Sequence, residues 1–549
     1  MSHSYVHAWY IPHMVRKWGI WIAAAAACAY IGAGAAEHSE TVNLAVAHRI
    51  RSEASGKNSK VMDTAFYLTD VYGPRLTGSP AARQAAEWAA GRLSEWGLSN
   101  VKLEPWGPFG RGWNCTRLVA EMAAPEFQPL IGFAQPWSPG TKGEVSGSAV
   151  LAVISSPEDF DQWHDKLRGK IVLAAAPHAS EMMTAAPAHR LSDAELAEAA
   201  TAPDPTSGNP AALPLGFVLP GGARGRGGRG QGGRAQREFR ARRNKFYQEE
   251  GVLLVLSPGA GPDGGTVMGS AAGSQDPDEV APPPSVILTN EHYNRIARLL
   301  EKHIPVSLAF DIRAEFTAPE DSFNITAELP GAAPNAGLVM LGGHFDSWTG
   351  GTGATDNAAG SAVAMEAMRI LKTLDAKMPR TVRLALWTGE EQGLLGSRAY
   401  VKQHFADPAD MKPKPEHARL SAYFNLDNGS GKIRGVYLQD NDELRPIFDT
   451  WLQPFHDLGA ATLTIRNTGS TDHMPFDAVG LPAFEFIQDP LEYSSRTHHS
   501  NMDVYDRLQA NDLEQAAAIM AWFAYNTATR PGMLPRKPMP KPVPGESTR

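Results

Sequence analysis

Three short apolar runs in the second half of the chain each end in side chains of the kind that bind metal ions. The runs are residues 338–341, 381–387 and 421–426, and the side chains that follow them are His344, Glu390, Glu391 and Asp427. Short apolar runs bounded by glycine and polar residues are typical of buried strands. Ligands gather at the carboxyl ends of the strands of an open α/β sheet, so we expect these polar ends to meet in one crevice.

The residue types at these strand ends favour a metal site. Zinc binds histidine nitrogen and carboxylate oxygen, and a catalytic zinc site keeps one coordination position for water. Two further stretches add ligands of the same kind, Asp356 and His499. A single histidine or strand-end aspartate is most often a hydrogen-bonded structural group, whereas the whole set predicts a metal centre.

The motifs around these residues resemble the M28 family of co-catalytic zinc exopeptidases. They are Gly-His-Phe-Asp-Ser at 343–347, Gly-Ala-Thr-Asp-Asn-Ala-Ala-Gly-Ser at 353–361, Trp-Thr-Gly-Glu-Glu-Gln-Gly-Leu-Leu-Gly-Ser at 387–397, Thr-Gly-Ser-Thr-Asp-His-Met-Pro-Phe at 468–476 and Thr-His-His-Ser-Asn-Met-Asp at 497–503. The resemblance implies an α/β fold with a mixed, mostly parallel sheet flanked by helices. It also implies two zinc ions per chain.

Carried over residue by residue, the resemblance gives each metal-type side chain a place. Asp356 is the expected bridge between the two ions. Glu391 and His499 would complete the ligands of one ion, and His344 and Asp427 those of the other.

The same resemblance implies two catalytic roles. Glu390 is the expected general base, which takes a proton from the attacking water and delivers it to the leaving amine. Adjacent residues at a strand end point in different directions, so Glu391 can bind metal while Glu390 faces the water. Asp346 is expected to orient His344 through its other ring nitrogen.

The later motifs predict one ligand and a set of pocket residues. His499 is preferred to His498 as the ligand, because the family places its histidine four residues before an aspartate, here Asp503. The family commonly has threonine after that aspartate, whereas this chain has Val504. Candidate substrate-binding residues are Asp472, His473 and Arg496.

The amino-terminal region predicts export to the periplasm or the outside of a bacterial cell. Residues 1–36 are an expected signal peptide, because a Val-Arg-Lys segment precedes an apolar, alanine-rich run and an Ala-Gly-Ala cleavage site. Translation could also start at Met14, directly before the Val-Arg-Lys segment. A retained membrane anchor is the alternative to cleavage. Cys28 lies in this leader and Cys115 is the only other cysteine, so the exported chain is expected to have no intrachain disulfide.

The catalytic domain is expected in two pieces, residues 37–118 and 315–531. The first piece contains Tyr-Gly-Pro-Arg-Leu-Thr-Gly-Ser at 72–79, which resembles the domain start of secreted family members. Residues 119–314 contain short apolar runs separated by turns and predict an inserted β-rich domain. Leu-Arg-Gly-Lys-Ile-Val-Leu at 167–173 resembles a protease-associated (PA) domain, and relatives with that domain are often homodimers.

Two segments are predicted to be solvated. Residues 221–243 are rich in glycine and arginine and predict a disordered loop. Such segments can also bind RNA, but the net charge of −8 and the scarcity of aromatic residues there argue against a nucleic-acid partner. The Pro-rich residues 532–549 predict an extended, mobile tail.

The combined prediction is an exported two-zinc exopeptidase with peptide substrates and no stable membrane association. The 72–79 motif and the single insertion favour the branch that contains plasma glutamate carboxypeptidase, and with it an aminopeptidase or dipeptidase that releases N-terminal residues. A carboxypeptidase of the same family is the main alternative. A carboxypeptidase needs a cationic side chain to bind the terminal carboxylate of the substrate, and the candidates are Arg466 and Arg496. An aminopeptidase needs an acidic side chain to bind the substrate ammonium, and the candidate is Glu485. A one-zinc glutaminyl cyclase and a non-catalytic receptor-like protein are less favoured, because all five ligands and Glu390 are present.

Overall fold

The computed structural model describes residues 40–179, 182–203, 215, 231–259, 261, 264–333 and 335–542. The chain divides into two compact units, Met1–Val42 and Asn43–Arg549, and the elements described below belong to the second. The predicted signal peptide at 1–36 lies outside the described residues, as do residues 221–230 of the Gly/Arg-rich segment. None of the helices in the described part combines the length and the apolarity that crossing a bilayer requires.

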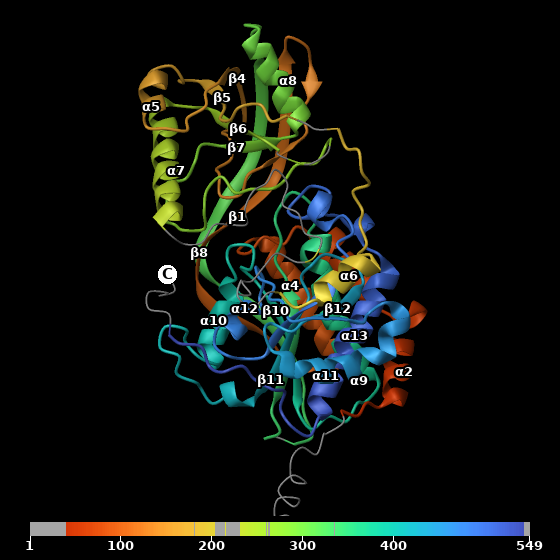
Figure 1. Ribbon diagram of the computed structural model, residues 1–549. Coiled ribbons are helices and arrows are strands. Elements are labelled where there is room, and N and C mark those ends of the chain that lie inside the picture. Colours follow the sequence, from red (N-terminus) through yellow and green to blue (C-terminus); the bar gives the residue numbers. More distant parts are fainter. Residues whose placement is uncertain are drawn as a thin grey trace, which may run out of the picture. The chain divides into compact units, whose positions relative to one another are not determined.

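One mixed sheet runs through this unit (Figure 1). Its catalytic end has the strand order β13 (Thr462–Thr464), β12 (Ile433–Tyr437), β14 (Ala483–Gln488), β11 (Leu420–Asn425), β9 (Leu338–His344) and β10 (Thr381–Trp387). β9 is parallel to both β10 and β11, and β11 is parallel to β14, whereas β12 is antiparallel to β14. The structure therefore confirms the predicted mixed, mostly parallel sheet.

Helices cover both faces of the central strands, which explains why those strands are mostly apolar. Every residue of β9 is buried, as is expected of a parallel strand between two helical layers. Phe424 of β11 contacts Phe523 at a ring-centroid distance of 5.6 Å, whereas the preceding Tyr423 stacks on Phe476 at 4.5 Å. Alternate side chains thus reach opposite layers. The helices involved are α9 (Ala359–Thr373) and α13 (Ala510–Thr529) on one face, and α10 (Leu395–His404) and α12 (Met474–Asp477) on the other.

The remaining helices of the catalytic end come before β1 and after β12. They are α2 (Leu44–Glu53), α3 (Val61–Phe66), α4 (Pro80–Glu95) and α11 (Arg445–Leu452). The loop between α3 and α4 contains the 72–79 motif, and Ser79 begins α4 by accepting a hydrogen bond from the backbone N–H of Ala82 at 3.1 Å. Serine at the N-cap followed by proline in the first turn is a common start for a helix, and it fixes where the loop ends.

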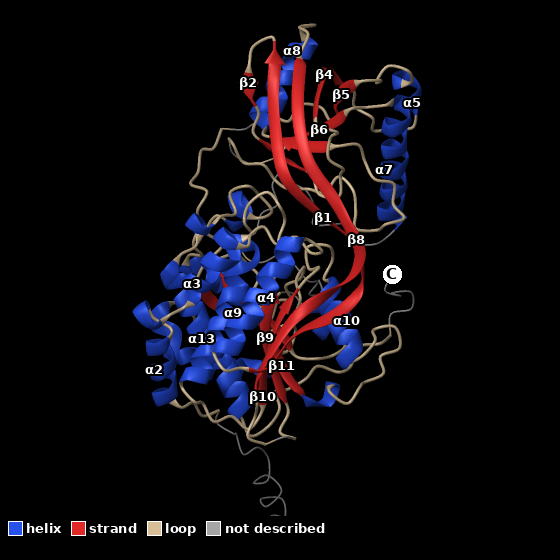
Figure 2. Cartoon of the chain, turned by 180° about the vertical axis from the view of Figure 1, so that it is seen from behind, coloured by secondary structure: helices blue, strands red, loops and turns tan. Residues whose placement is uncertain are grey.

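Two long antiparallel strands, β1 (Ser99–Ala124) and β8 (Ser307–Leu329), connect the catalytic end of the sheet to the inserted region (Figure 2). The last residues of β8 pair with β10, and its first residues pair with β4 (Glu144–Leu151). The predicted domain boundaries, at 118/119 and 314/315, therefore fall inside β1 and β8. They were placed at changes of composition, whereas the backbone ladder continues through both.

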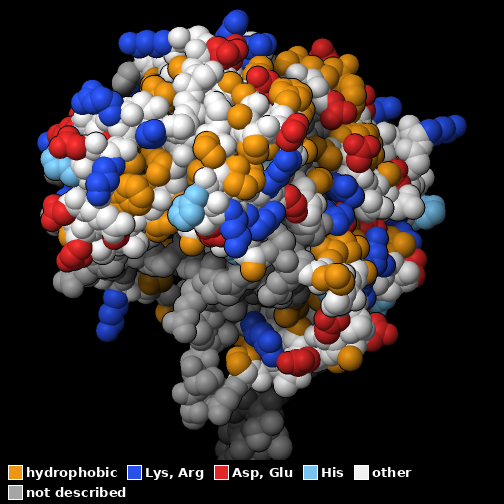
Figure 3. Space-filling view, turned by 90° about the horizontal axis from the view of Figure 1, so that it is seen from above, with side chains coloured by type: hydrophobic (Ala, Val, Ile, Leu, Met, Phe, Trp, Pro, Cys, Tyr) orange, Lys and Arg blue, Asp and Glu red, His pale blue; other side chains and the backbone are white. Residues whose placement is uncertain are grey.

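The inserted region continues the sheet with four short strands. β4, β5 (Lys170–Leu173), β6 (Leu254–Pro258) and β7 (Ser285–Leu288) are parallel, and β3 (Gly132–Ala134) is antiparallel to β7. β2 (Gln128–Pro129) pairs with β1, and the helices of the region are α5 (Glu158–Trp163), α6 (Asp193–Ala200), α7 (Gln231–Glu250) and α8 (Asn290–Glu301). Short strands are thus present where the sequence predicts a β-rich inserted region, and the PA identity stays a prediction. Basic and acidic side chains are interspersed on the face seen from above (Figure 3).

The structure differs from the predicted loop at residues 231–243, because these residues begin α7. The glycines end at Gly233, and the Arg, Gln and Glu residues that follow are good helix formers. Phe239, Phe246 and the buried Tyr247 pack into an apolar cluster with Phe160. An aromatic face therefore fixes a segment whose composition alone predicts disorder.

The first part of the Pro-rich tail lacks helix and strand, yet it packs on the catalytic end. The side chain of Leu534 is buried, and its N–H donates to Ser421 Oγ at 3.2 Å. Arg536 donates to the carbonyl of His417 at 3.0 Å, and Lys537 Nζ lies 2.6 Å from Asp477 Oδ1. Residues 534–537 therefore pack on the catalytic end, the mobility of the tail stays a prediction, and residues 543–549 lie outside the described part.

His404, at the end of α10, lies between two carboxylates. Its Nε2 is 2.6 Å from Glu104 Oε1 on β1, and its Nδ1 is 3.2 Å from Glu416 Oε2. Burial acts to lower the pKa of His404, but the hydrogen bonds with Glu104 and Glu416 outweigh it and raise the pKa above its ordinary value. The charged imidazole thus connects α10 to β1 and to the segment before β11.

We expect His404 to make the stability of the fold depend on pH. A raised pKa stabilises the folded state fully below the ordinary histidine value of about 6.5, and this contribution is lost as the pH rises through the folded-state pKa. Urea titrations give the free energy of unfolding of the wild type and of His404→Gln at each pH. The advantage of the wild type over the variant should be about 1 kcal/mol smaller at about pH 9 than at about pH 6. An equal difference at the two pH values would contradict this.

Candidate metal centre

The carboxyl ends of β9, β10 and β11 lie at one edge of the sheet and carry the predicted polar residues. His344 is the last residue of β9 and pairs with Trp387 at the end of β10, so Glu390 and Glu391 follow at the same level. Asp427 comes two residues after the end of β11. This confirms the strand assignments from which the crevice was predicted.

His344 lies between two carboxylates at this edge. Its Nε2 is 3.1 Å from Asp356 Oδ1 and 3.1 Å from Asp427 Oδ1. Asp356 stands at the start of α9, in the turn Ala354–Ala358, and its peptide bond with Asn357 is cis. At Gly360 in the first turn of α9, a Cβ atom would overlap the carbonyl oxygen of Leu426, so glycine allows the helix to begin this close to the end of β11.

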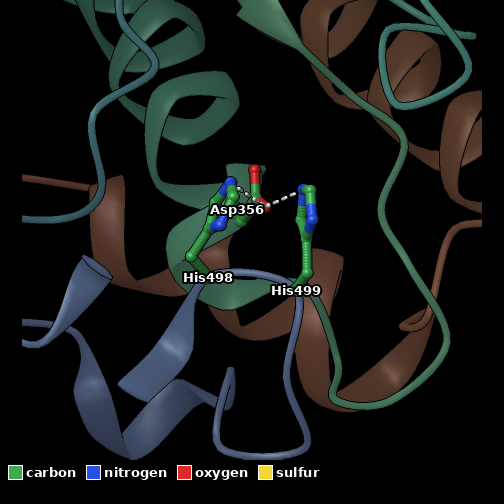
Figure 4. Close-up of side chains that lie close together, drawn as sticks. All are labelled: Asp356, His498 and His499. Carbon is green, nitrogen blue, oxygen red and sulfur yellow. Dashed lines mark ion pairs between the residues drawn. The ribbon is translucent and has the colours of Figure 1, made fainter. Parts of the chain in front are cut away.

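The other oxygen of Asp356 faces His499. Asp356 Oδ2 is 3.3 Å from His499 Nε2, and that same nitrogen is 2.9 Å from Glu391 Oε2. Figure 4 shows the Asp356 carboxylate beside both imidazoles, with one ion pair drawn to His498 and one to His499. Asp356 therefore presents one oxygen to His344 and the other to His499, which is the arrangement a carboxylate needs to bridge two ions.

These distances fit a metal site. With ligand bonds of about 2.0–2.2 Å and tetrahedral angles, two donors on one zinc ion lie roughly 3.3–3.6 Å apart. The observed separations between the side-chain donors are 2.9–3.3 Å, which is at or a few tenths of an ångström below the lower end of that range. Asp356 Oδ2 is also buried without a hydrogen-bond donor, so a cation there would satisfy it.

The surroundings of the site carry a surplus of negative charge. Burial acts to lower the pKa of His344, but the carboxylates of Asp427, Asp346 and Asp356 outweigh it and hold the pKa well above its ordinary value. Burial raises the pKa of Glu390 well above its ordinary value, and nearby carboxylates add to this effect against the opposing influence of His344. A divalent cation would supply the positive charge that these groups lack.

Asp346 contacts His344 differently from the prediction. The backbone carbonyl of Asp346 is 3.0 Å from His344 Nδ1, whereas its carboxylate Oδ1 is 3.7 Å away. The carboxylate accepts hydrogen bonds from Thr77 Oγ1 at 2.9 Å and from the backbone N–H of Glu390 at 3.3 Å. Asp346 therefore connects the loop after β9 to the loop after β10, and its main chain faces the imidazole.

The 72–79 motif, predicted only as the start of the domain, contacts the loops of the metal centre directly. Arg75 is fully buried and donates to the carbonyls of Phe345 at 2.8 Å, Thr352 at 3.0 Å and Gly353 at 2.9 Å, and also to that of Leu68. Burial lowers the pKa of Arg75 to about 10. An arginine within a Gly- and Pro-containing loop is the available sequence signal, but three of its four partners lie 270 or more residues away.

Asp503 fixes the backbone around Asp356. Its Oδ1 accepts hydrogen bonds from the N–H of Thr355 at 2.5 Å and from the hydroxyl of Thr355 at 2.8 Å, and its Oδ2 accepts from the N–H of Asp356 at 3.3 Å. Thr355 Oγ1 is also 2.8 Å from Thr497 Oγ1. Val504 replaces the threonine that is common after this aspartate in the family and supplies no hydroxyl group. The hydroxyl groups near Asp503 come instead from Thr355 and Thr497.

His498 lies beside the predicted ligand His499. The two rings stack with centroids 3.7 Å apart, and His498 Nε2 is 4.0 Å from Asp356 Oδ2. Burial and the neighbouring His499 lower the pKa of His498 to about 3, so its imidazole is neutral. His499 is closer to Asp356, at 3.3 Å, and His498 is a further candidate ligand outside the predicted set.

The predicted pocket residues Asp472 and His473 are both buried, but they differ in their hydrogen bonds. Asp472 is fully buried; one of its oxygens accepts from Ser397 Oγ and the other has no hydrogen-bond donor. His473 is buried with its Nε2 3.0 Å from the carbonyl oxygen of Thr468, and burial lowers its pKa to about 4. These contacts give His473 a structural place in its turn.

The charged candidates for recognising a peptide end are already engaged. Arg496 Nη1 is 2.8 Å from Glu492 Oε1, and Arg466 Nη2 donates to the carbonyl of Glu198 at 3.2 Å. Glu485 is fully buried and accepts a hydrogen bond from the backbone N–H of Asp427 at 2.8 Å. Glu485 therefore orients the backbone of the loop that contains Asp427.

Comparisons with known proteins relate this chain to peptidases. Residues 324–524 match the family model described as Peptidase family M28. Carboxypeptidase Q from Bos taurus is 27% identical over 474 residues, which cover 85% of this chain and 85% of that protein. Leupeptin-inactivating enzyme 1 from Streptomyces exfoliatus is 32% identical over 161 residues, which cover 29% of this chain and 34% of that protein.

Two solved structures share the fold. The peptidase M28 precursor from Shewanella amazonensis has a TM-score of 0.62 and 24% identity, and the match covers 90% of this chain and 98% of that one. The zinc aminopeptidase BSAP from Bacillus subtilis has a TM-score of 0.53 and 17% identity, with 86% and 95% covered. Residues 324–524 of this chain are therefore a peptidase family M28 domain, and the chain is a metallopeptidase.

Proposed function

We propose that this chain is an exported two-zinc exopeptidase that releases residues from the free N-termini of peptides. The arrangement of Asp356 carries this proposal, because its two oxygens face His344 and His499 separately. Asp427 lies with His344 and Glu391 lies with His499, so the five proposed ligands divide into two sets that share one carboxylate. Zinc is the proposed metal because histidine nitrogen and carboxylate oxygen are its usual catalytic ligands.

Within this proposal Glu390 performs the proton transfers. Zinc bound by the two ligand sets supplies Lewis acidity for the attacking water and for the scissile carbonyl. Glu390 takes the proton of that water and returns it to the leaving amine. Burial and the nearby carboxylates raise the pKa of Glu390, which makes its carboxylate a stronger base.

The charge of the site supports recognition of a free N-terminus. Five carboxylates lie at or beside the metal centre: Asp356, Glu390, Glu391, Asp427 and Asp472. The two proposed zinc ions would offset the charges of Asp356, Glu391 and Asp427, which leaves Glu390 and Asp472 as the acidic groups that favour a substrate ammonium over a terminal carboxylate. A carboxypeptidase would need Arg496 to leave Glu492, with which it forms an ion pair at 2.8 Å.

Export is part of the proposal because the leader at 1–36 has the order of a signal peptide: a basic segment, an apolar run and small residues. The inserted region that follows the first catalytic piece is proposed to be a PA domain. The relatives named Carboxypeptidase Q match this chain over 85% of its length, which includes that region.

A panel of one peptide in three forms tests which end is recognised. We expect the free peptide and its C-terminal amide to lose residues from the N-terminus at similar rates. The N-acetylated form should react on the order of 100-fold more slowly, because the acidic groups would lose their cationic partner. The products are identified by mass spectrometry.

Each other pattern in the panel has a separate meaning. Slow cleavage of the amide with normal cleavage of the acetylated peptide would make the enzyme a carboxypeptidase. Equal cleavage of all three forms would contradict an exopeptidase altogether.

A further inference from the structure

The loop that carries His499, residues 489–503, is contacted on two sides by segments of the inserted region. It connects β14 to the final part of the domain and contains no strand of the sheet. The contacting segments are residues 187–191 and 265–269, which come more than 200 residues earlier in the chain. The inserted region is therefore in direct contact with the backbone of a proposed metal ligand.

The first segment contacts the beginning of this loop. His189 and Leu491 form an antiparallel bridge, with N–H to oxygen distances of 2.9 and 2.8 Å. Asp489 is fully buried, and its carboxylate accepts from the N–H of Leu191 at 3.0 Å and from Arg190 at 2.9 Å. Arg434 of β12 donates to the same carboxylate at 2.8 Å.

The second segment contacts the loop beside the ligand itself. The side chain of Asn501 accepts from the N–H of Val267 at 2.7 Å and donates to the carbonyl of Gly265 at 3.0 Å. The N–H of Asn501 also donates to the carbonyl of Val267 at 3.2 Å. The N–H of Gly269 donates to the carbonyl of His499 at 2.5 Å.

His499 depends on these contacts more than His344 does. His344 belongs to a central strand and is 1% exposed, whereas the His499 side chain is 25% exposed. The backbone of His499 has a φ of 55°, in the left-handed region that is uncommon for residues other than glycine. A strained loop residue keeps such a conformation only where its surroundings determine it.

We propose that Asn501 is a positioning residue: by joining the loop of His499 to residues 265–267, it directs the imidazole toward Asp356 and Glu391. The inserted region thereby sets how tightly the ion at His499 is bound. This inference rests on the proposed function, because it requires a metal ion at His499. Partners that orient a metal ligand typically change metal affinity 10- to 100-fold when they are removed.

Asn294 provides a matched control within the inserted region. Its side chain makes the same pair of bonds as that of Asn501, accepting from the N–H of His178 at 3.1 Å and donating to the carbonyl of His178 at 2.6 Å. These bonds join α8 to the segment after β5. Asn294→Ala therefore removes equivalent chemistry without removing a contact to the loop of His499.

The test is a zinc titration of the full-length chain against a competing chelator, with the melting temperature of the metal-free protein measured in parallel. In Asn501→Ala we expect one of the two zinc affinities to fall about 10- to 100-fold and the other to stay at the wild-type value. Asn501→Asp keeps the acceptor for Val267 and should give a smaller loss. Asn294→Ala should leave both affinities unchanged.

The remaining outcomes decide against the inference or against the proposal beneath it. Wild-type affinities at both positions in Asn501→Ala would overturn the positioning role. So would an equal loss at both positions, or the same loss in Asn294→Ala, because those results indicate general destabilisation. A wild-type chain that binds fewer than two zinc ions overturns the proposed two-zinc function and this inference with it.

Discussion

Replacing Glu390 by glutamine should reduce kcat by about 10²- to 10⁴-fold, the contribution typical of a general base, and should leave the metal content unchanged. The substitution keeps the size of the side chain and removes only its ability to accept a proton. Its neighbour Glu391, and not Glu390, lies 2.9 Å from His499. The metal ligands therefore remain complete in Glu390→Gln.

Glu391→Gln is the matched control, since it makes the same chemical change one residue further along the chain. It removes a carboxylate from the His499 ligand set, so we expect it to lower zinc content as well as turnover. Metal analysis and steady-state kinetics on both variants give the comparison. If Glu390→Gln lost as much zinc as Glu391→Gln, or kept wild-type turnover, Glu390 would not be the base.

Replacing Arg75 by methionine should lower the free energy of unfolding by about 3–5 kcal/mol. Methionine fills much of the space but donates no hydrogen bond, and a buried acceptor left without a donor costs about 1–3 kcal/mol. The carbonyls that would lose their donor belong to Leu68, Phe345, Thr352 and Gly353. Lysine at this position should rescue only part of the loss, because an ammonium lacks the planar fork that reaches several carbonyls at once.

Urea titrations of Arg75→Met and Arg117→Met measure this effect against a control. Arg117 lies on β1 with its side chain 48% exposed, and it forms an ion pair with Asp311 at 2.6 Å. Exposed pairs of this kind typically contribute less than about 1 kcal/mol. Equal effects of the two substitutions would show that the buried hydrogen bonds of Arg75 do not stabilise the loops of the metal centre.

The sequence predicts the strand ends of the catalytic sheet well because several independent signals coincide there. β9, β10 and β11 are largely buried, so their sequences are mostly apolar, and glycine or polar residues mark where each one ends. Parallel pairing then brings His344, Glu390 and Asp427 to one edge without further information. The convergence of these strand-end residues could be predicted because their position depends mainly on local pattern and on sheet topology, whereas the ligand roles of Asp356 and His499 come from the resemblance to the M28 family and stay predictions.

The residues that orient the ligands could not be predicted in the same way. Arg75, Asp503 and Asn501 act through backbone groups, and backbone groups leave no trace in the sequence of their partners. Arg75 contacts a carbonyl 270 residues away, and Asn501 contacts a segment 234 residues away. Local patterns therefore predict which side chains meet at the strand ends, whereas the long-range contacts that direct them appear only in the fold.

The domain boundaries and the Gly/Arg-rich segment show a second limit of sequence patterns. Composition changes near residues 119 and 314, but β1 and β8 continue through both positions because backbone pairing does not depend on composition. α7 begins inside the segment predicted as a loop, because Phe239, Phe246 and Tyr247 acquire partners from the rest of the inserted region. Tertiary contacts decide the structure in both cases.

Metal analysis of the purified wild-type chain tests the central claim most directly. The protein is equilibrated with a small excess of zinc, freed of unbound metal by gel filtration, and analysed for zinc and protein in the same fractions. Because Asp356 presents one oxygen to each of two ligand sets, we expect two zinc ions per chain. A value that saturates at one zinc ion per chain, with full peptidase activity, would contradict the two-zinc account.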